Sequence, residues 1–166
     1  MNDQFFMKKA LAQAKIARSA GEFPVGCVIV YKDHIIASGA RASSVGKRPN
    51  EIDHAELIAL KKLADTEKSY NMKQTILYCT MEPCLMCFGA ILLSGIGRIV
   101  YAHEDIMGGG TNCDLLKLNP LYRDAGITIV PHILRDESLA LFKEFFSNPE
   151  NTYWKDSMLA KYTLNQ

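Results

Sequence analysis

Residues 83–87 read Pro-Cys-Leu-Met-Cys, and they stand between two apolar runs, Thr-Ile-Leu-Tyr-Cys-Thr at 75–80 and Phe-Gly-Ala-Ile-Leu-Leu at 88–93. The first run has the length and composition of a strand that helices cover on both faces. Proline suits the first turn of a helix, so the second run is expected to belong to a helix that begins at Pro83. The segment therefore predicts a strand followed directly by a helix that carries both cysteines in its first turn.

The same alternation of strands and helices extends along the chain in both directions. Apolar spacing predicts helices at 4–20, 56–63 and 136–146, the last capped by Asp136, and strands at 26–31, 34–39, 97–103 and 127–133. Lys32-Asp33 joins the first two of these strands as a short hairpin. Helices alternating with strands cover both faces of a sheet. We therefore expect an α/β fold, a three-layer α/β/α arrangement around a central mixed five-stranded sheet.

Length and composition are those of an ordinary globular domain. With 166 residues, 48% hydrophobic and 22% charged, the chain is long enough for one well-buried core and short for two. We expect one domain over residues 1–166, with a helical tail at about 147–166. No run approaches the roughly 18 apolar residues of a membrane span, and no signal peptide is recognised. Five cysteines fit no disulfide framework, which favours a cytoplasmic protein without a membrane partner.

Three residues have the character and spacing of metal ligands. Cys84 and Cys87 can place two thiolates on one side of a helix start, and His54 can add a nitrogen. No fourth protein ligand is apparent. An open position is what a catalytic zinc needs, because the ion lowers the pKa of a water towards about 7. Glu56 can stay off the metal and move protons. The pattern therefore predicts metal-assisted hydrolysis.

Other kinds of site also use paired cysteines. A Cys-x-x-Cys pair alone is more often a structural zinc clip or a redox pair. A structural clip normally takes four ligands, however, and a redox pair needs no His-x-Glu partner. The two halves together favour a catalytic zinc, with a non-catalytic zinc-stabilised binding domain as a remote alternative.

His-Ala-Glu at 54–56 followed by Pro-Cys-x-x-Cys at 83–87 resembles the signature of the cytidine deaminase superfamily. Phe-Pro-Val-Gly at 23–26 and Glu82 before the proline are similar to the branch that contains the bacterial tRNA adenosine deaminases and guanine deaminases. The resemblance covers roughly residues 5–146. It implies a cytidine deaminase-like fold and the hydrolytic removal of an exocyclic amine from a nucleobase.

The resemblance also assigns roles to individual residues. It implies that His54, Cys84 and Cys87 hold Zn²⁺ and that Glu56 is the catalytic proton shuttle. It further implies a set of substrate-binding residues around the base: Pro24, Val25, Ala55, Glu82, Pro83 and Asp105. His103 is added because it ends a predicted strand, where the crevice of an open α/β sheet lies. Members of this branch form homodimers, so a homodimer is expected, and the helix at 88–93 could contribute to its interface.

Two departures from the tRNA-specific enzymes bear on the substrate. Those enzymes carry an asparagine that contacts the nucleotide shortly after the position of Gly39, where this chain has Ala40-Arg41. They also turn arginine-rich after the equivalent of Phe145-Phe146, whereas the tail here has no net positive charge. Such a tail gives little counterion release on binding RNA. We therefore expect a free base or nucleoside as the substrate, with tRNA-specific adenosine deamination to inosine as the alternative.

The surroundings of the pocket should separate these two substrates. A basic patch of Arg41, Lys47 and Arg48 at the entrance would favour tRNA as a partner. In the tail, Tyr153 or Trp154 is expected either to cover the pocket as a lid or to pack in the core.

Overall fold

A five-stranded sheet forms the centre of the protein in the computed structural model, which describes residues 2–166. The strand order is β2-β1-β3-β4-β5, and β1 runs antiparallel to β2 and β3, whereas β3, β4 and β5 are parallel. The mixed five-stranded sheet predicted from the sequence is confirmed. The strands are β1 (Gly26–Tyr31), β2 (His34–Ala40), β3 (Thr75–Met81), β4 (Arg98–His103) and β5 (Thr128–Val130).

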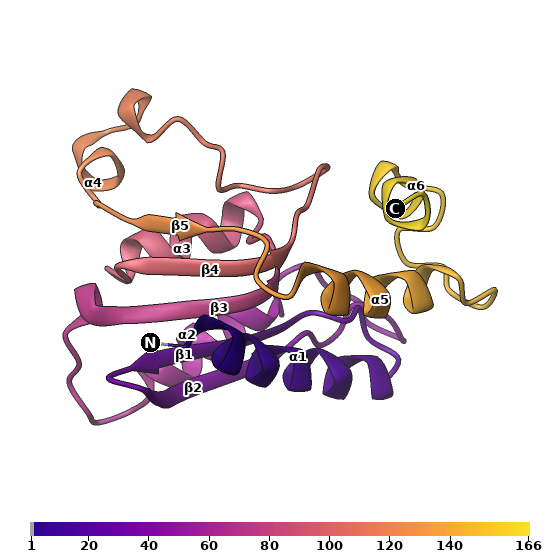
Figure 1. Cartoon of the computed structure of the whole chain (residues 1–166), viewed down its shortest axis with the longest axis horizontal. Coiled ribbons are helices and arrows are strands. Elements are labelled where there is room, and N and C mark those ends of the chain that lie inside the picture. The colour runs from indigo at the N-terminus through magenta and orange to yellow at the C-terminus, as the bar shows by residue number, and fades with distance from the viewer. Residues whose placement is uncertain (1) are drawn as a thin grey trace.

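Helices cover both faces of this sheet (Figure 1). One face carries α1 (Asp3–Ser19) and α5 (Arg135–Phe146), which also touch each other. The other face carries α2 (Ala55–Ala64) and α3 (Leu85–Leu93). The shorter helices are α4 (Pro120–Arg123) and α6 (Met158–Leu164), with single 3₁₀ turns η1 (Met72–Gln74) and η2 (Leu115–Lys117). The three-layer α/β/α architecture is therefore confirmed.

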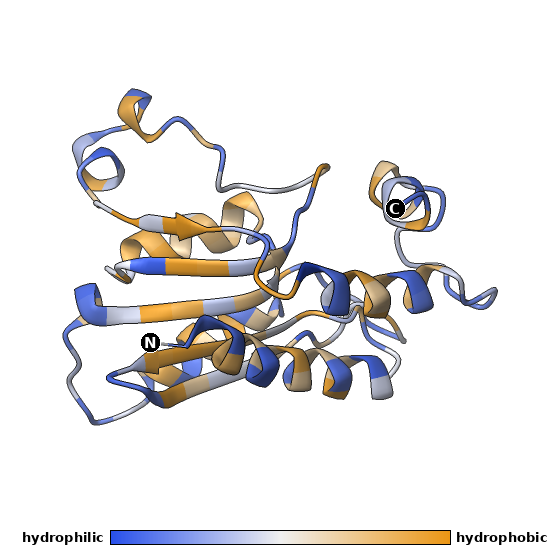
Figure 2. Cartoon of the chain, viewed as in Figure 1, coloured by the Kyte–Doolittle hydropathy of each residue, from blue (hydrophilic) through white to orange (hydrophobic). Residues whose placement is uncertain are grey.

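Covering both faces explains why the central strands are apolar throughout. All seven residues of β3 are buried. Successive side chains of a strand point to opposite faces, so Leu77 and Cys79 join the core under α2 and α3, while Ile76 and Tyr78 join the core under α1. Figure 2 shows the apolar colouring along the middle strands and the two-sided colouring of α1 and α5.

Turn residues in the left-handed region set several element ends. Lys32 and Asp33 have φ of 47° and 63°, which makes the two-residue turn of the predicted β1–β2 hairpin without a glycine. His132 and Leu134, with φ of 65° and 55°, end β5 early, so the strand is shorter than the predicted 127–133.

Two helix starts also differ from the predictions. Leu134 is the N-cap residue of α5, and Asp136 lies in the first turn, so the predicted Asp136 cap is wrong. Helix α3 begins at Leu85 with Cys84 as its N-cap residue, because Pro83 still belongs to the extended segment after β3. The spacing of apolar residues predicts that a helix is present but does not locate its first residue. It therefore cannot predict shifts of one or two residues at a helix start.

The predicted tail contains α6, which packs against α5 and lies beyond the carboxyl ends of β3 and β4 (Figure 1). Over residues 2–166, no helix is both long enough and apolar enough to cross a membrane.

Candidate active site

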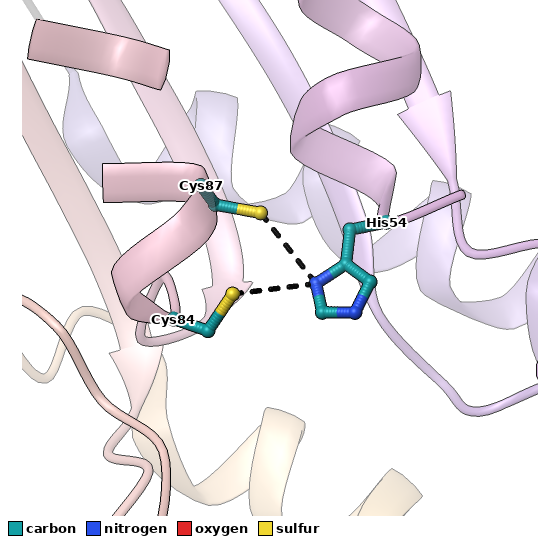
Figure 3. Close-up of side chains that lie close together, drawn as sticks. All are labelled: His54, Cys84 and Cys87. Atoms are coloured by element: carbon teal, nitrogen blue, oxygen red, sulfur yellow. Dashed lines mark hydrogen bonds between the residues drawn. The ribbon is translucent and has the colours of Figure 1, made fainter. Parts of the chain in front are cut away.

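The three predicted metal ligands come from two helix starts that lie side by side. His54 is the N-cap residue of α2 and Cys84 is the N-cap residue of α3, while Cys87 lies in the first turn of α3. Their side chains converge in Figure 3. The Nδ1 atom of His54 lies 3.6 Å from the Sγ of Cys84 and 3.5 Å from the Sγ of Cys87. These are the distances of three ligands around one ion.

A zinc ion fits this arrangement. Zn–N bonds of about 2.0–2.1 Å and Zn–S bonds of about 2.3 Å at a tetrahedral angle put the nitrogen and sulfur about 3.6 Å apart. Across the described chain, this trio is the group of His, Cys, Asp and Glu side chains whose ligand atoms gather, all within 4.8 Å of one another. The donor set of one imidazole and two thiols leaves one tetrahedral position to a small molecule. The site is therefore of the catalytic type.

The protein favours a thiolate at Cys84 before any ion binds, whereas the hydrogen bond with Cys84 and burial raise the pKa of Cys87. The hydrogen bond with the Cys87 thiol lowers the pKa of Cys84, and the neighbouring His54 adds to the effect. Both cysteines also lie at the positive end of the α3 dipole, which stabilises negative charge. On its other side His54 faces a carboxylate, because its Nε2 lies 3.7 Å from Oε2 of Glu51. A carboxylate in this position orients a ligand imidazole.

Glu56 lies in the first turn of α2, one residue beyond Ala55, and only 3% of it is exposed. Burial raises the pKa of its carboxyl group above the ordinary value. Its Oε2 atom has no hydrogen-bond partner among the described residues. A buried carboxyl group with a raised pKa and one oxygen left without a partner has the properties of a proton shuttle.

A cavity of about 250 Å³ opens in front of these groups. Its wall includes His54, Glu56 and Cys84 from the metal side, and Tyr153 and Trp154 from the tail. The volume is that of a site for a small ring rather than for a large ligand.

The comparisons with known proteins agree with this geometry. The model of the cytidine and deoxycytidylate deaminase zinc-binding region matches residues 1–103. The chain belongs to this deaminase family. It is a zinc-dependent hydrolytic enzyme that removes an amine from a nucleobase, and the predicted superfamily membership and Zn²⁺ cofactor are confirmed.

Related deaminases differ in their substrates. The tRNA-specific adenosine deaminase of Buchnera aphidicola subsp. Schizaphis graminum is 35% identical over 153 residues, covering 88% of this chain and 95% of that protein. The enzyme of the same name from Bacillus subtilis is 32% identical over 146 residues, covering 87% and 88%. The solved guanine deaminase of Nitrosomonas europaea has a TM-score of 0.64 at 22% identity, covering 84% and 81%, and shows the shared fold alone.

In this deaminase, four of the predicted substrate-binding residues line the cavity, namely Val25, Ala55, Glu82 and Asp105. Pro24 and Pro83 are buried beside the cavity and are not part of its lining. They shape the backbone that carries their neighbours.

His103 lies outside the cavity lining, against the prediction that it touches substrate. It is fully buried between the rings of Phe142 and Tyr162, and its Nε2 lies 3.5 Å from the hydroxyl of Thr163. Burial lowers its pKa to about 4. The last residue of β4 therefore packs under the tail, although the crevice lies at the same edge of the sheet.

Glu82 lines the cavity, but its carboxylate is occupied. It accepts hydrogen bonds from the backbone N–H groups of Asp105 and Thr111 and from the Thr111 hydroxyl. A Cβ atom on Gly109 would stand 2.5 Å from this carboxylate, and one on Gly110 would stand 2.7 Å from the backbone of Leu85. The loop after β4 therefore closes tightly over the start of α3. The sequence analysis gave no role to Gly109 and Gly110, and three consecutive glycines at 108–110 are the signal that marks them.

The three basic residues that would favour tRNA do not form one patch at the entrance. Arg41 is 3% exposed and lines the cavity wall, whereas Lys47 and Arg48 are exposed on the same loop. Arg41 is drawn inward because the loop at 41–53 folds around its guanidinium. A polar loop gives no sequence signal for such burial.

The tail contributes to the cavity wall and also packs against the core, whereas its role as a lid stays a prediction. Tyr153 and Trp154 line the cavity, and the Tyr153 ring packs on Phe23. The Tyr153 hydroxyl donates a 2.9 Å hydrogen bond to Glu51. Trp154 holds a left-handed conformation, with φ of 52°. Glu51 and Phe23 are site residues that the sequence analysis did not identify as such.

Proposed function

We propose that this deaminase converts adenosine to inosine in tRNA. The observation that carries the proposal is the 35% identity to a tRNA-specific adenosine deaminase over 88% of the chain. The relatives thus favour the substrate that the sequence analysis had placed second, behind a free base or nucleoside. The reaction exchanges the 6-amino group for oxygen, so that adenosine and water give inosine and ammonia.

Each residue of the site has a part in this proposal. His54, Cys84 and Cys87 hold zinc, which when bound supplies Lewis acidity that lowers the pKa of a water. Glu56 takes the two protons of that water in turn and delivers the first to the ring nitrogen and the second to the amino group, which leaves as ammonia while the oxygen stays on the ring carbon. The unpaired Oε2 of Glu56 and its raised pKa support this assignment. The backbone at Ala55 and at Glu82 holds the edge of the base.

RNA requires positive charge outside the cavity. Lys47 and Arg48 are exposed on the loop that also carries Arg41 and Glu51 to the cavity wall. We assign to these two side chains the contacts with phosphates that flank the target nucleotide. Each phosphate contact with single-stranded RNA adds about −0.7 to the slope of log affinity against log salt.

The test compares a tRNA pool with free adenosine, adenine, guanine and cytosine, each followed by ammonia release at about 50 to 200 mM salt. We expect turnover of tRNA with a steep loss at higher salt, and inosine in the product. Replacing both Lys47 and Arg48 by alanine should reduce the salt slope by about 1.4. The matched control replaces Lys8 and Lys9, exposed on α1 over the other face of the sheet, and should leave the slope unchanged.

A second candidate, a free purine base or nucleoside, is favoured by the cavity itself. Aromatic side chains of the tail stand at its wall, and carboxylates outnumber the one arginine there: Glu51, Glu56, Glu82 and Asp105 against Arg41. Such a wall accepts a neutral ring and repels phosphate. Turnover of a free base or nucleoside that does not respond to salt, with no inosine in tRNA, would reverse the order of the two proposals.

We also propose a homodimer in the cytoplasm. Support for a second copy comes from exposed leucines on α3 and α4, such as Leu93 at 59% and Leu121 at 66% exposed. Unpaired thiols at the metal site support a reducing compartment. Sedimentation should give twice the chain mass, and Leu93→Lys should give the monomer.

A further inference from the structure

Three buried side-chain atoms lack a hydrogen-bond partner among the described residues, and two of them belong to the wall of one cavity. These are Oε2 of Glu56 and Nε of Arg41, whereas the third, Nδ1 of His103, lies elsewhere. Leaving a buried donor unpaired costs about 1–3 kcal/mol, and more for a charged group. The Arg41 donor therefore has the character of a group that a ligand completes.

The rest of the Arg41 guanidinium is fixed in place. Nη1 donates to the carbonyl of Ala42 at 2.6 Å, and Nη2 donates to the carbonyl of Asn50 at 2.7 Å and to Glu51 at 3.2 Å. Only 2% of the side chain is exposed. Because the guanidinium is planar and rigid, these bonds also fix the direction of the Nε–H bond. This donor is pre-oriented rather than mobile.

The acceptor for this donor must be uncharged. Glu51 already balances the charge of Arg41 in a 3.2 Å ion pair. Glu56, Glu82 and Asp105 add carboxylates to the same wall. A phosphate or carboxylate ligand would meet net repulsion in such a cavity. A ring nitrogen or a carbonyl oxygen on a flat base meets none, and the aromatic wall of Tyr153 and Trp154 suits a flat ring.

We propose that Arg41 is a specificity-determining residue that donates a hydrogen bond from Nε to a ring nitrogen or carbonyl oxygen of the base in the cavity. The inference rests on the proposed function, since it assumes that a nucleobase is what binds there. It adds a criterion by which the protein discriminates between bases, because a base that lacks this one acceptor leaves the Nε–H donor unpaired.

Trp154 gives a direct measure of binding, because it is the single tryptophan of the chain and lines the cavity. The experiment titrates zinc-loaded Glu56→Gln protein, which holds ligands without turnover, with adenosine, 7-deazaadenosine and 3-deazaadenosine. Each deaza analogue removes one ring acceptor. The dissociation constants are then measured again with Arg41→Gln added.

We expect one deaza analogue to bind about 10- to 100-fold more weakly than adenosine, the ratio that a hydrogen bond from a charged donor gives. With Arg41→Gln this ratio should fall to about 1, because the donor is gone. Arg123→Gln, an exposed arginine on α4, is the matched control and should keep the ratio. Zinc content and thermal melting establish that each variant is folded. Should Arg41→Gln fail to fold, Arg41→Lys keeps the charge beside Glu51 but lacks the Nε–H donor. In this variant the ratio of the two dissociation constants should also fall to about 1.

The failures of the two proposals are distinguishable. If Arg41→Gln and Arg41→Lys weaken all three ligands equally, or leave the ratio as in the parent, Arg41 only supports the loop and the inference is overturned while the proposed function stands. If no purine nucleoside changes the fluorescence and ammonia release finds no nucleobase substrate, free or in RNA, both are overturned.

Discussion

Two glutamates near the C-terminal tail show how the same side chain serves opposite purposes. Glu104 accepts hydrogen bonds from Arg135 at 2.5 and 2.8 Å and from the Tyr162 hydroxyl, and these contacts hold its pKa well below the usual range. Glu56 is more deeply buried, has an unpaired oxygen, and its pKa is raised by that burial. A carboxylate whose oxygens all have hydrogen-bond partners stabilises the fold. A carboxylate with an unpartnered oxygen remains available for proton transfer.

The contrast also divides the molecule. The Glu104 cluster joins the end of β4 to α5 and α6, so it docks the tail. The Glu56 side faces the cavity and the metal ligands. Changes in the first region should alter stability, and changes in the second should alter turnover.

The largest effect is expected from the metal ligands, because they contribute to stability and to turnover. Cys87→Ser should reduce zinc from about one per chain to a small fraction, abolish turnover and lower the melting temperature, because metal binding is coupled to folding. Metal analysis and calorimetry measure both. The buried Cys79→Ser, which is not a ligand, is the matched control and should keep its zinc. Full activity without metal in Cys87→Ser would contradict the assignment.

Glu56→Gln should separate chemistry from stability. Turnover should fall by about 10²- to 10⁴-fold, the usual worth of general acid–base help, while zinc content stays at that of the wild type. The melting temperature should not fall, because the charge removed is one that burial opposes. Steady-state ammonia release together with metal analysis tests this, and a variant as fast as the wild type would exclude Glu56 as the shuttle.

Glu104→Gln should show the reverse. Losing the charged acceptor should cost about 1–3 kcal/mol of unfolding free energy, since hydrogen bonds to charged groups are worth about that much. Zinc content should not change. Glu137→Gln, exposed on α5, is the matched control and should be near neutral. Urea unfolding measures both variants, and equal stability of the two would show that the Glu104 cluster does not hold the tail.

The smallest expected effect is the pH dependence of the difference in unfolding free energy between the wild type and Glu104→Gln. The pKa of Glu104 is lowered in the folded protein from an ordinary value near 4.5. Its stabilisation is therefore complete above that value and is lost as the pH falls towards the folded pKa, because the unfolded chain then binds more protons. The gap between wild type and Glu104→Gln should be constant from pH 7 to about 5 and narrow below about 4.5. A gap that widens on acidification would contradict the ion pairing.

Local patterns in the sequence predicted the strands, the layers and the metal ligands, because buried strands and a two-part ligand motif are both properties of short segments. The positions of Arg41 and Glu51 were beyond such patterns. Both lie in a polar loop whose composition indicates the surface, and only the folded loop shows that it wraps a guanidinium. His103 was misplaced for a similar reason, since nothing in β4 indicates that α6 returns to cover its end.

The Glu51 carboxylate joins the C-terminal tail to the loop at 41–53 and to a metal ligand. One of its oxygens accepts from Tyr153 in the tail and from Arg41 in the loop, and the same oxygen faces Nε2 of the ligand His54. Because all three groups share one oxygen, the tail, the buried arginine and the ligand imidazole are positioned by a single carboxylate. A substitution at Tyr153 therefore changes the surroundings of a metal ligand, although the two residues lie far apart in the sequence.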